Sequence, residues 1–468
     1  MKTILLSLCL FGSSGMFAQV FTGTPIQSRM QQLNEYFSAC EVYALDGKSL
    51  HRFITSDSGS DRIQLVLGEK AFSWRLEENN MIRPETRGTT ISNGEYVPLQ
   101  FDRTCITYKA ISETTGIESR LTITPTMIIG MLREKEDVYF LQPASHFLPD
   151  ADPDWLILFR PEDQRTTTEG ICKTPPVTFD IVNPYNNTIK TPSEIPGSRR
   201  TFSCLELEVA FCTDNRMYSD FNMDTDSMLT YNLTVMNIME PLYDDFDLDF
   251  WVYDFFMVTS ENVNDNPWGA SLEIDELVDA FQAWANSYFG IPDIGHLWTG
   301  GNLYSDEGSG VAGYAPGNIC DETYCLLESN PEVFNFYARL MAHEYGHLFD
   351  ADHAEGTGTI MEPIIDDITC DCWSVNSLED MWDYIEDAGC LQSCVQCPLT
   401  YSIIDYIGWG DWRYSALDHI NSTAKIDEEA DVIFQSEGYV KLLPGFNATS
   451  LLNPEDGATF VAKIAPCE

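Results

Sequence analysis

Short runs in which hydrophobic and polar residues alternate fill the first part of the chain. Alternation of this kind, broken by turn residues, predicts strands. The clearest runs are residues 119–124, 127–132, 138–141 and 155–159. We therefore expect residues 19–200 to form one β-rich unit. Its last stretch, residues 175–196, holds prolines and asparagines with little periodicity, which is typical of a linker.

The pattern changes near residue 201, where apolar runs of strand length begin to alternate with helical periodicity. The predicted elements are strands at 205–211 and 250–258 and helices at 214–245, 272–288 and 374–388. Asn330 and Pro331 would cap and open a further helix, since both residue types favour the start of a helix. Alternating strands and helices predict an α/β domain with a mostly parallel sheet over residues 201–397.

Alternation returns in the last part of the chain, residues 398–468. Two stretches, 440–446 and 460–464, carry it most clearly. We expect a small β-module here, which is similar to the C-terminal modules of secreted bacterial enzymes. The sequence does not distinguish among three roles for this module: adhesion, export and stability.

The N-terminus has the features of a secretory signal peptide. Lys2 precedes an apolar stretch, Ile4–Phe11, which is followed by small residues and Ala18. Such a segment is too short to anchor the chain, so we expect cleavage after residue 18 and a secreted, extracellular protein. No internal apolar run is long enough for a transmembrane helix, and secretion makes disulfides the default state of the cysteines.

Charge further limits the partners. The chain carries a formal net charge of −47, and only six of its 26 basic residues follow position 200. So acidic a surface excludes binding to nucleic acid or to anionic lipid. A solvated surface explains the excess best, although the cluster of Asp244, Asp245, Asp247 and Asp249 leaves Ca²⁺ binding open.

Candidate chemistry is concentrated in residues 343–353, which hold three of the seven histidines. His343 and His347 are four residues apart, so they project from one face of a helix and can share a zinc ion. His353 would complete a three-nitrogen site that leaves one position for water. Glu344 lies beside the first ligand, where it can act as general base. The run predicts a zinc hydrolase.

A methionine supports a narrower assignment. Met361 lies eight residues after His353, and residues 296–320 combine a threonine-glycine strand end, a glycine-rich stretch and a cysteine. With these marks the chain resembles metzincin zinc peptidases of the adamalysin (reprolysin) type over about residues 203–390. The resemblance implies that Met361 forms a Met-turn beneath the zinc site. It also implies an edge strand at His296–Gly300 that pairs with peptide substrate.

Two residues depart from the family pattern. Asp350 stands where the family usually has glycine, at a turn that favours a left-handed backbone, which aspartate tolerates better than most residues. Ala354 replaces the aspartate that commonly follows the third histidine. Both changes leave the ligands intact but keep the subfamily open.

Cysteines supply a candidate inhibitor. Without the signal peptide, thirteen of the 14 cysteines remain, so one thiol should be unpaired, and ten follow a dibasic pair at 199–200 that is a candidate activation site. The odd thiol then belongs to residues 19–200, which resemble the propeptide of the adamalysin family. The resemblance implies a thiol in the open zinc position before cleavage, which we assign to Cys172, with Cys40 and Cys105 as alternatives. Lys173 would favour its deprotonation.

We therefore expect a secreted zinc endopeptidase that is made as a latent precursor and cleaves extracellular proteins. Its predicted parts are a signal peptide (1–18), a propeptide with linker (19–200), a metzincin-type catalytic domain (201–397) and a β-module (398–468). A secreted adhesin with a structural zinc site is the alternative. Glu344 argues against it, because a structural site needs no general base.

Overall fold

The computed structural model describes residues 18–56, 61–135, 137–165, 170–174, 204–289, 292–306, 308–320, 323–329, 334–393, 400–403, 406–407, 410–416, 419–426, 430–436, 438–444, 446–448 and 460–464. Nearly all of the predicted signal peptide, the linker, the dibasic pair and the helix start at Asn330 lie outside these residues. Contacts divide the chain into two compact units. The first holds residues 1–191, 207–245 and 250–391, and the second holds 192–206, 246–249 and 392–468.

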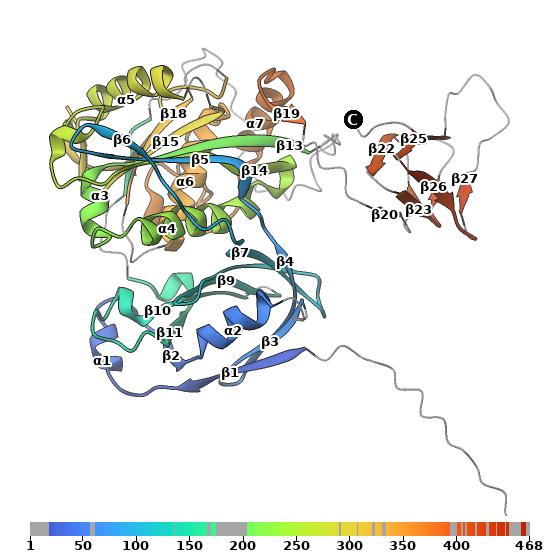
Figure 1. The fold of residues 1–468 in the computed structure, drawn as a ribbon, viewed down its shortest axis with the longest axis horizontal. Coiled ribbons are helices and arrows are strands. Elements are labelled where there is room, and N and C mark those ends of the chain that lie inside the picture. The colour runs from blue at the N-terminus through green and yellow to red at the C-terminus, as the bar shows by residue number, and fades with distance from the viewer. Residues whose placement is uncertain are drawn as a thin grey trace, which may run out of the picture. The chain divides into compact units, whose positions relative to one another are not determined.

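The N-terminal part of the first unit is a closed β-barrel, which confirms the expected β-rich region (Figure 1). Apolar side chains such as Leu65, Trp74 and Leu121 fill its interior, because alternate residues of each strand point inward. The strands, in their order around the barrel, are β1 (Gln19–Pro25), β2 (Glu41–Ala44), β11 (Trp155–Phe159), β10 (Asp137–Pro143), β9 (Ile128–Glu134), β8 (Glu118–Ile123), β7 (Thr107–Ser112), β4 (Lys70–Glu78) and β3 (Arg62–Leu67). β1 closes the barrel by pairing in parallel with β3.

Two short helices accompany the barrel. They are α1 (Met30–Leu33) and α2 (Gly47–Ile54). Asp46 caps α2, because its carboxylate accepts a hydrogen bond of 2.9 Å from the backbone N–H of Ser49. Leu50 lies on the inner face of α2 and joins the core of the barrel.

The α/β region of the first unit is built on a ten-stranded sheet. Its main order is β12 (Ile171–Cys172), β17 (Gly308–Tyr314), β18 (Tyr324–Glu328), β15 (Ile294–Thr299), β13 (Leu205–Thr213), β14 (Leu248–Val258), β5 (Ile82–Ser92) and β6 (Glu95–Pro98). Two further strands, β16 (Leu303–Ser305) and β19 (Gln392–Ser393), pair with β17 and β13. The central strands β13, β15 and β18 pair in parallel, as predicted, whereas β17 is antiparallel to β18.

The position of the threonine-glycine strand differs from the prediction. His296–Gly300 was expected at the edge of the sheet, but β15 lies between β13 and β18. All six of its residues are buried, which fits an interior strand covered on both faces. Within the α/β region the strand beside the site is instead β17, which lies outside β18.

The expected long helix at 214–245 is broken into two. The helices are α3 (Asn215–Asp220) and α4 (Thr225–Met239), followed by a 3-10 turn at Glu240–Phe246. Asn222 and Met223 have φ of 53° and 61°, which no continuous helix allows. Asp224 then caps α4 by accepting from the N–H of Asp226.

The other helices agree with their predicted positions. They are α5 (Ile274–Tyr288), α6 (Phe334–Leu348) and α7 (Val375–Asp387). α5 buries Leu277 and Phe281 against β13, β15 and β18 in one apolar core. Ser374 caps α7 by accepting from the N–H of Ser377 at 3.1 Å. None of the described helices is long and apolar enough to cross a membrane.

The second unit contains three small parallel sheets, which confirms the expected β-module. Strands recur at intervals of about twenty residues, with Thr400 beside His419 and His419 beside Tyr439, as in a three-sided β-helix. Ile420 and Phe434 belong to its apolar interior. The sheets are β20 (Thr400–Ile403), β23 (His419–Ser422) and β26 (Tyr439–Leu442); β21 (Tyr406–Ile407), β24 (Lys425–Ile426) and β27 (Asn447–Ala448); and β22 (Gly410–Ala416), β25 (Ala430–Ser436) and β28 (Phe460–Ile464).

Cysteine pairing is less complete than the parity argument predicted. Cys320 is bonded to Cys390 and Cys370 to Cys372, and Cys204 is also in a disulfide. Among the cysteines that the structure describes, five are free, not one: Cys40, Cys105, Cys172, Cys212 and Cys325. The last two lie on β13 and β18 with no exposed surface, where a thiol packs as a small apolar side chain.

Candidate metal centre and active site

The first two histidines of the site come from α6, which is the most deeply buried helix of the α/β region. Every described residue from Phe334 to Leu348 except Arg339 is buried. The helix is held to its surroundings by Tyr243, whose hydroxyl donates to the carbonyl oxygen of Ala342 at 2.7 Å. His343 and His347, one turn apart, therefore leave a rigid surface on the same side, as their spacing predicted.

A tight turn brings the third histidine back to the helix. Asp350 has φ of 69°, so the left-handed backbone expected at this position is confirmed. Its carboxylate accepts a hydrogen bond of 3.1 Å from the amide of Asn318, and Ala351 N–H closes the turn on the carbonyl of Gly346. The chain then runs toward the helix face, and His353 faces His347.

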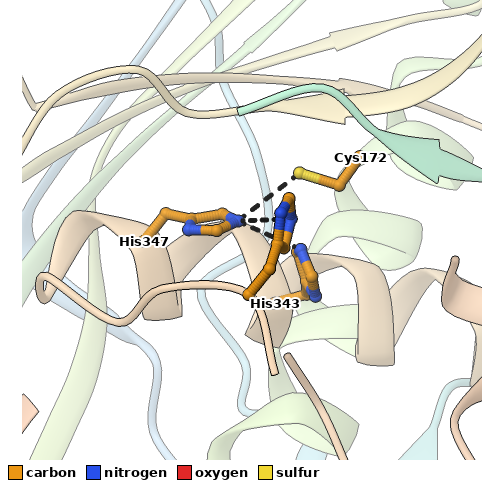
Figure 2. A group of neighbouring side chains, drawn as sticks. Cys172, His343 and His347 are labelled. Carbon is orange, nitrogen blue, oxygen red and sulfur yellow. Dashed lines mark hydrogen bonds between the residues drawn. The ribbon is translucent and has the colours of Figure 1, made fainter. Parts of the chain in front are cut away.

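The three imidazoles converge on one point. Nε2 of His347 lies 3.1 Å from Nε2 of His343 and 3.2 Å from Nε2 of His353. The thiol of Cys172 completes the group, with its Sγ 3.5 Å from Nε2 of His347. Figure 2 shows the imidazoles pointing toward one another, with Cys172 arriving from a strand on the opposite side.

The outer nitrogens of the rings explain why the inner ones face inward. Nδ1 of His343 donates to the carbonyl of Ile360 at 2.7 Å, and Nδ1 of His347 donates to that of Ala351 at 2.8 Å. Each ring then presents the lone pair of Nε2 to the centre. Lone pairs this close repel one another unless a cation lies between them, and backbone carbonyls behind the ligands are typical of metal sites.

The geometry of this group fits zinc. Zn–N bonds of about 2.0–2.1 Å in a tetrahedron would separate two nitrogens by roughly 3.4 Å and a nitrogen from a thiolate sulfur by roughly 3.6 Å. The separations of 3.1, 3.2 and 3.5 Å lie close to these values. Three imidazoles and a thiol are also donors that zinc prefers. Burial lowers the pKa of His343 to about 3, which keeps its ring in the neutral form that binds metals.

Cys172 reaches the site on a short segment, residues 170–174, that lies between β17 and Pro363. Its N–H donates to the carbonyl of Pro363 at 3.0 Å, while on the other side β12 pairs in parallel with β17. Burial and the neighbouring Glu344 raise the pKa of the Cys172 thiol well above its usual range. Lys173 was predicted to favour deprotonation of this thiol, but burial and Glu344 have the larger effect on its pKa. A bound cation would be needed to lower that pKa.

Glu344 lies beside the histidines with no exposed surface. Burial raises the pKa of its carboxyl to about 8, although the Cys172 thiol and the Thr174 hydroxyl lower it in part. Thr174 Oγ1 donates to Glu344 Oε2 at 3.3 Å, and the same Oγ1 accepts from Ala315 N–H at 2.9 Å. Gly313 on β17 passes so close that a Cβ there would lie 2.7 Å from Glu344 Cδ.

Met361 lies under the helix that carries the ligands. It is fully buried, and a Cβ added at Gly346 would meet its Sδ at 2.7 Å. The turn is tied to the third histidine's segment by a hydrogen bond of 2.8 Å from Ala354 N–H to the carbonyl of Met361. The structure thus brings Met361, the predicted Met-turn residue, against Gly346 of α6.

Other candidates lie elsewhere or gain no support. Cys40 and Cys105 are not part of the cluster: among the described residues, the group that could hold a metal is Cys172 with the three histidines. Calcium binding near Asp244 is therefore unsupported. Gly170, Thr174 and Gly313 were not predicted as site residues. Gly313 lies in a glycine-rich stretch, and nothing marks Thr174 except its distance of two residues from Cys172.

Comparison with known proteins gives the family. Residues 206–386 match the model of metallo-peptidase family M12, Reprolysin_5. This part of the chain is similar to the M12 metallopeptidases. Enzymes of this family use zinc and act on proteins or peptides, so the expected class of zinc metallopeptidase is confirmed at the level of the family.

Two other comparisons add less. A crystal structure, metalloproteinase-II from Bacteroides fragilis, is similar to the chain with a TM-score of 0.38 and 10% identity, over 75% of this chain and 93% of that one. No curated protein matches the chain.

Proposed function

We propose that this protein is a secreted, adamalysin-like zinc endopeptidase that is made as a latent precursor. The observation that carries the proposal is the convergence of three Nε2 atoms at 3.1–3.2 Å beside the buried carboxyl of Glu344. An ion bound by three histidines keeps a fourth position for water, which is the arrangement of a catalytic rather than a structural zinc site.

The residues divide the work as follows. His343, His347 and His353 would hold zinc, which supplies a Lewis acid for the scissile carbonyl and acidifies water. Glu344 would accept the proton of that water and return it to the leaving amine. Its burial suits this role, because a carboxyl with a pKa near neutrality exchanges protons efficiently at neutral pH. Met361 would support α6 from below and bind nothing.

Latency is proposed from the segment at 170–174. Cys172 Sγ lies where a water would otherwise complete the metal site, 3.5 Å from His347 Nε2. Thr174 covers the carboxylate of Glu344 at 3.3 Å. Three backbone hydrogen bonds fix the segment on its two sides. Cys172 N–H donates to the carbonyl of Pro363 and Lys173 N–H to that of Gly313, while the carbonyl of Gly170 accepts from Ile365 N–H. A substrate strand needs the same edge of β17, so the segment excludes it.

Secretion and activation complete the proposal. Residues 1–18 are proposed as a signal peptide, which agrees with the start of β1 at Gln19. Cleavage at the dibasic pair 199–200 would then free Cys172 from its continuous connection to the catalytic domain. Disulfides such as Cys320–Cys390 suit an oxidising exterior.

Casein hydrolysis by the cleaved protein tests the activity. We expect Glu344→Ala to abolish hydrolysis while it leaves the zinc content, measured by atomic emission, at one ion per chain. A chelated sample should also be inactive and should recover on addition of Zn²⁺. Activity that survives the substitution or the chelation would refute the mechanism.

The uncut chain tests the latency. It should hydrolyse casein far more slowly than the cut chain, and Cys172→Ala should raise the activity of the uncut chain. Equal activity of cut and uncut wild-type protein would remove the latency claim but not the peptidase assignment. The adhesin alternative predicts bound zinc without hydrolysis in every sample.

A further inference from the structure

Part of the N-terminal region belongs to the catalytic sheet. β5 and β6 form a hairpin inserted between barrel strands β4 and β7, yet they extend the sheet at the edge opposite β12 (Figure 1). β5 pairs in parallel with β14, with Phe255 opposite Gly88 and Val258 opposite Ile91. The outer edge of the peptidase domain is therefore closed by residues from the first hundred of the chain.

Backbone hydrogen bonds fasten the hairpin to β14 from the middle of that strand to the residue after its end. Val252 N–H donates to the carbonyl of Met81 at 2.8 Å, and Thr259 N–H donates to that of Ile91 at 2.8 Å. Between them, the hydroxyl of Thr86 donates to the carbonyl of Val252 at 2.6 Å. These groups would otherwise form an open sheet edge.

Side chains also join β5 to β14, through apolar packing and through an ion pair. Ile91 is 3% exposed and belongs to the core beneath α5 together with Phe256. The guanidinium of Arg87 lies 3.1 Å from the carboxylate of Asp254, which is 2% exposed, and 4.7 Å from the ring centre of Tyr253. Removing the hairpin would strip a buried carboxylate of its cation and open an apolar edge strand, which invites aggregation.

A second contact lies between the barrel and the end of α4. Arg120 on β8 is 1% exposed and is paired with Glu240, which also accepts a hydrogen bond of 2.6 Å from the amide of Asn79. Asn237 on α4 donates to the carbonyl of Leu121 at 3.1 Å. Separating the barrel would leave these buried polar groups without their partners.

The inhibitory strand is held much less extensively. β12 has two residues, whereas β5 has eleven, and the β5–β6 hairpin continues into barrel strands at both of its ends. The described cysteines of the N-terminal region, Cys40, Cys105 and Cys172, are free, so no disulfide among them joins it to the peptidase domain.

We propose that the N-terminal region stays bound to the peptidase domain after activation, as a non-covalent subunit that supplies β5 and β6, while β12 alone leaves the cleft. This rests on the proposed function only for the cut between Cys172 and Cys204. The partner that fits the open edge of β14 is thus a segment of the same precursor. The N-terminal region would then both inhibit the peptidase domain through β12 and complete its sheet through β5 and β6.

The test uses the full chain with a recognition sequence for a site-specific protease placed at residues 185–190. After cutting, size-exclusion chromatography with light scattering should show one species with the mass of both fragments, in reducing buffer and in 1 M NaCl alike. Two separate species, with a soluble monomeric peptidase fragment, would overturn the proposal. The readout does not depend on activity, so a failed peptidase assignment leaves it interpretable.

Hydrogen exchange separates the two edges. After the cut, amides of β14 should keep the protection that they have in the uncut chain, while those of β17 should exchange at least tenfold faster. Loss of protection in β14 would refute retention of the hairpin. Unchanged protection in β17 would instead count against release of β12, which is a claim of the proposed function.

A substitution at the junction supplies a matched comparison. Ile91→Asp should make the cut fragments separate, whereas Glu95→Ser, at the exposed start of β6 in the same hairpin, should not. If Ile91→Asp prevents folding of the uncut chain, exchange at β14 in the wild-type cut sample remains decisive. Fragments that stay together in folded Ile91→Asp protein would show that the hairpin does not hold them.

Discussion

Gly170→Ala should activate the uncut precursor without touching a metal ligand. A Cβ on Gly170 would overlap the ring of Phe336, lying 3.0 Å from its Cε2 and 3.3 Å from Cβ of Ala312. Carbon atoms pack best at about 3.5–4.0 Å. Phe336 is 4% exposed and packs edge-on against Tyr337, so its ring has little room to move.

The size of the effect follows from the cost of overpacking. One extra methyl group in a packed site costs about 1–3 kcal/mol. Because about 1.4 kcal/mol changes an equilibrium tenfold, the population with the segment out of the cleft should rise about 5- to 140-fold. The casein activity of the uncut chain should rise by the same factor, up to the limit set by the cut enzyme.

The assay compares initial rates of uncut wild type, Gly170→Ala and Gly389→Ala. Gly389 is exposed, and a Cβ there meets no atom within 4 Å, so it controls for the glycine substitution itself. After cutting, all three proteins should hydrolyse casein equally fast. Wild-type rates in folded, zinc-loaded Gly170→Ala would refute the idea that docking of residues 170–174 limits activity.

Three further outcomes are expected. Glu344→Gln should lower kcat by about 10²–10⁴-fold without loss of zinc, and a parallel loss of zinc would point to a structural role. Asp350→Val should lower the free energy of unfolding by about 1–3 kcal/mol because φ is 69°, whereas Asp350→Gly should stay within about 1 kcal/mol in chemical denaturation. Burial raises the pKa of Glu328 to about 7 and that of Asp254 to about 6, so the folded chain holds protons that the unfolded chain releases above pH about 4. Stability should therefore fall as pH rises from 4.5 to 7. In Glu328→Gln the melting temperature should change less steeply with pH than in the wild type, and an unchanged pH dependence would contradict the assignment to buried Glu328.

The sequence predicted the features that depend on local spacing. The i, i+4 histidines define one helix face whatever surrounds them, and the turn at Asp350 follows from the position of His353. Helix ends were also accessible where a cap marks them, as Ser374 marks α7. The break at Asn222 was missed because helical periodicity continues on both sides of it.

Contacts between distant segments could not be predicted in this way. Asn93-Gly94, with φ of 53° and 76°, is a strong hairpin signal, but nothing local says that the hairpin joins β14 rather than the barrel. The parity of the cysteines failed for a similar reason. Cys212 and Cys325 lie in core strands with no exposed surface, and Cys212 belongs to an apolar cluster.

The origin of β5 also sets the order in which the sheet can form. Thr86 is made 166 residues before its partner Val252. At about 5–20 residues per second, a ribosome needs roughly 8–33 s to deliver β14 after the hairpin has emerged. During that time the hairpin's apolar face has no strand to cover it, and such long-range pairing folds slowly once both are present. Overproduction should therefore yield aggregates from nascent chains well before the completed precursor shows any instability.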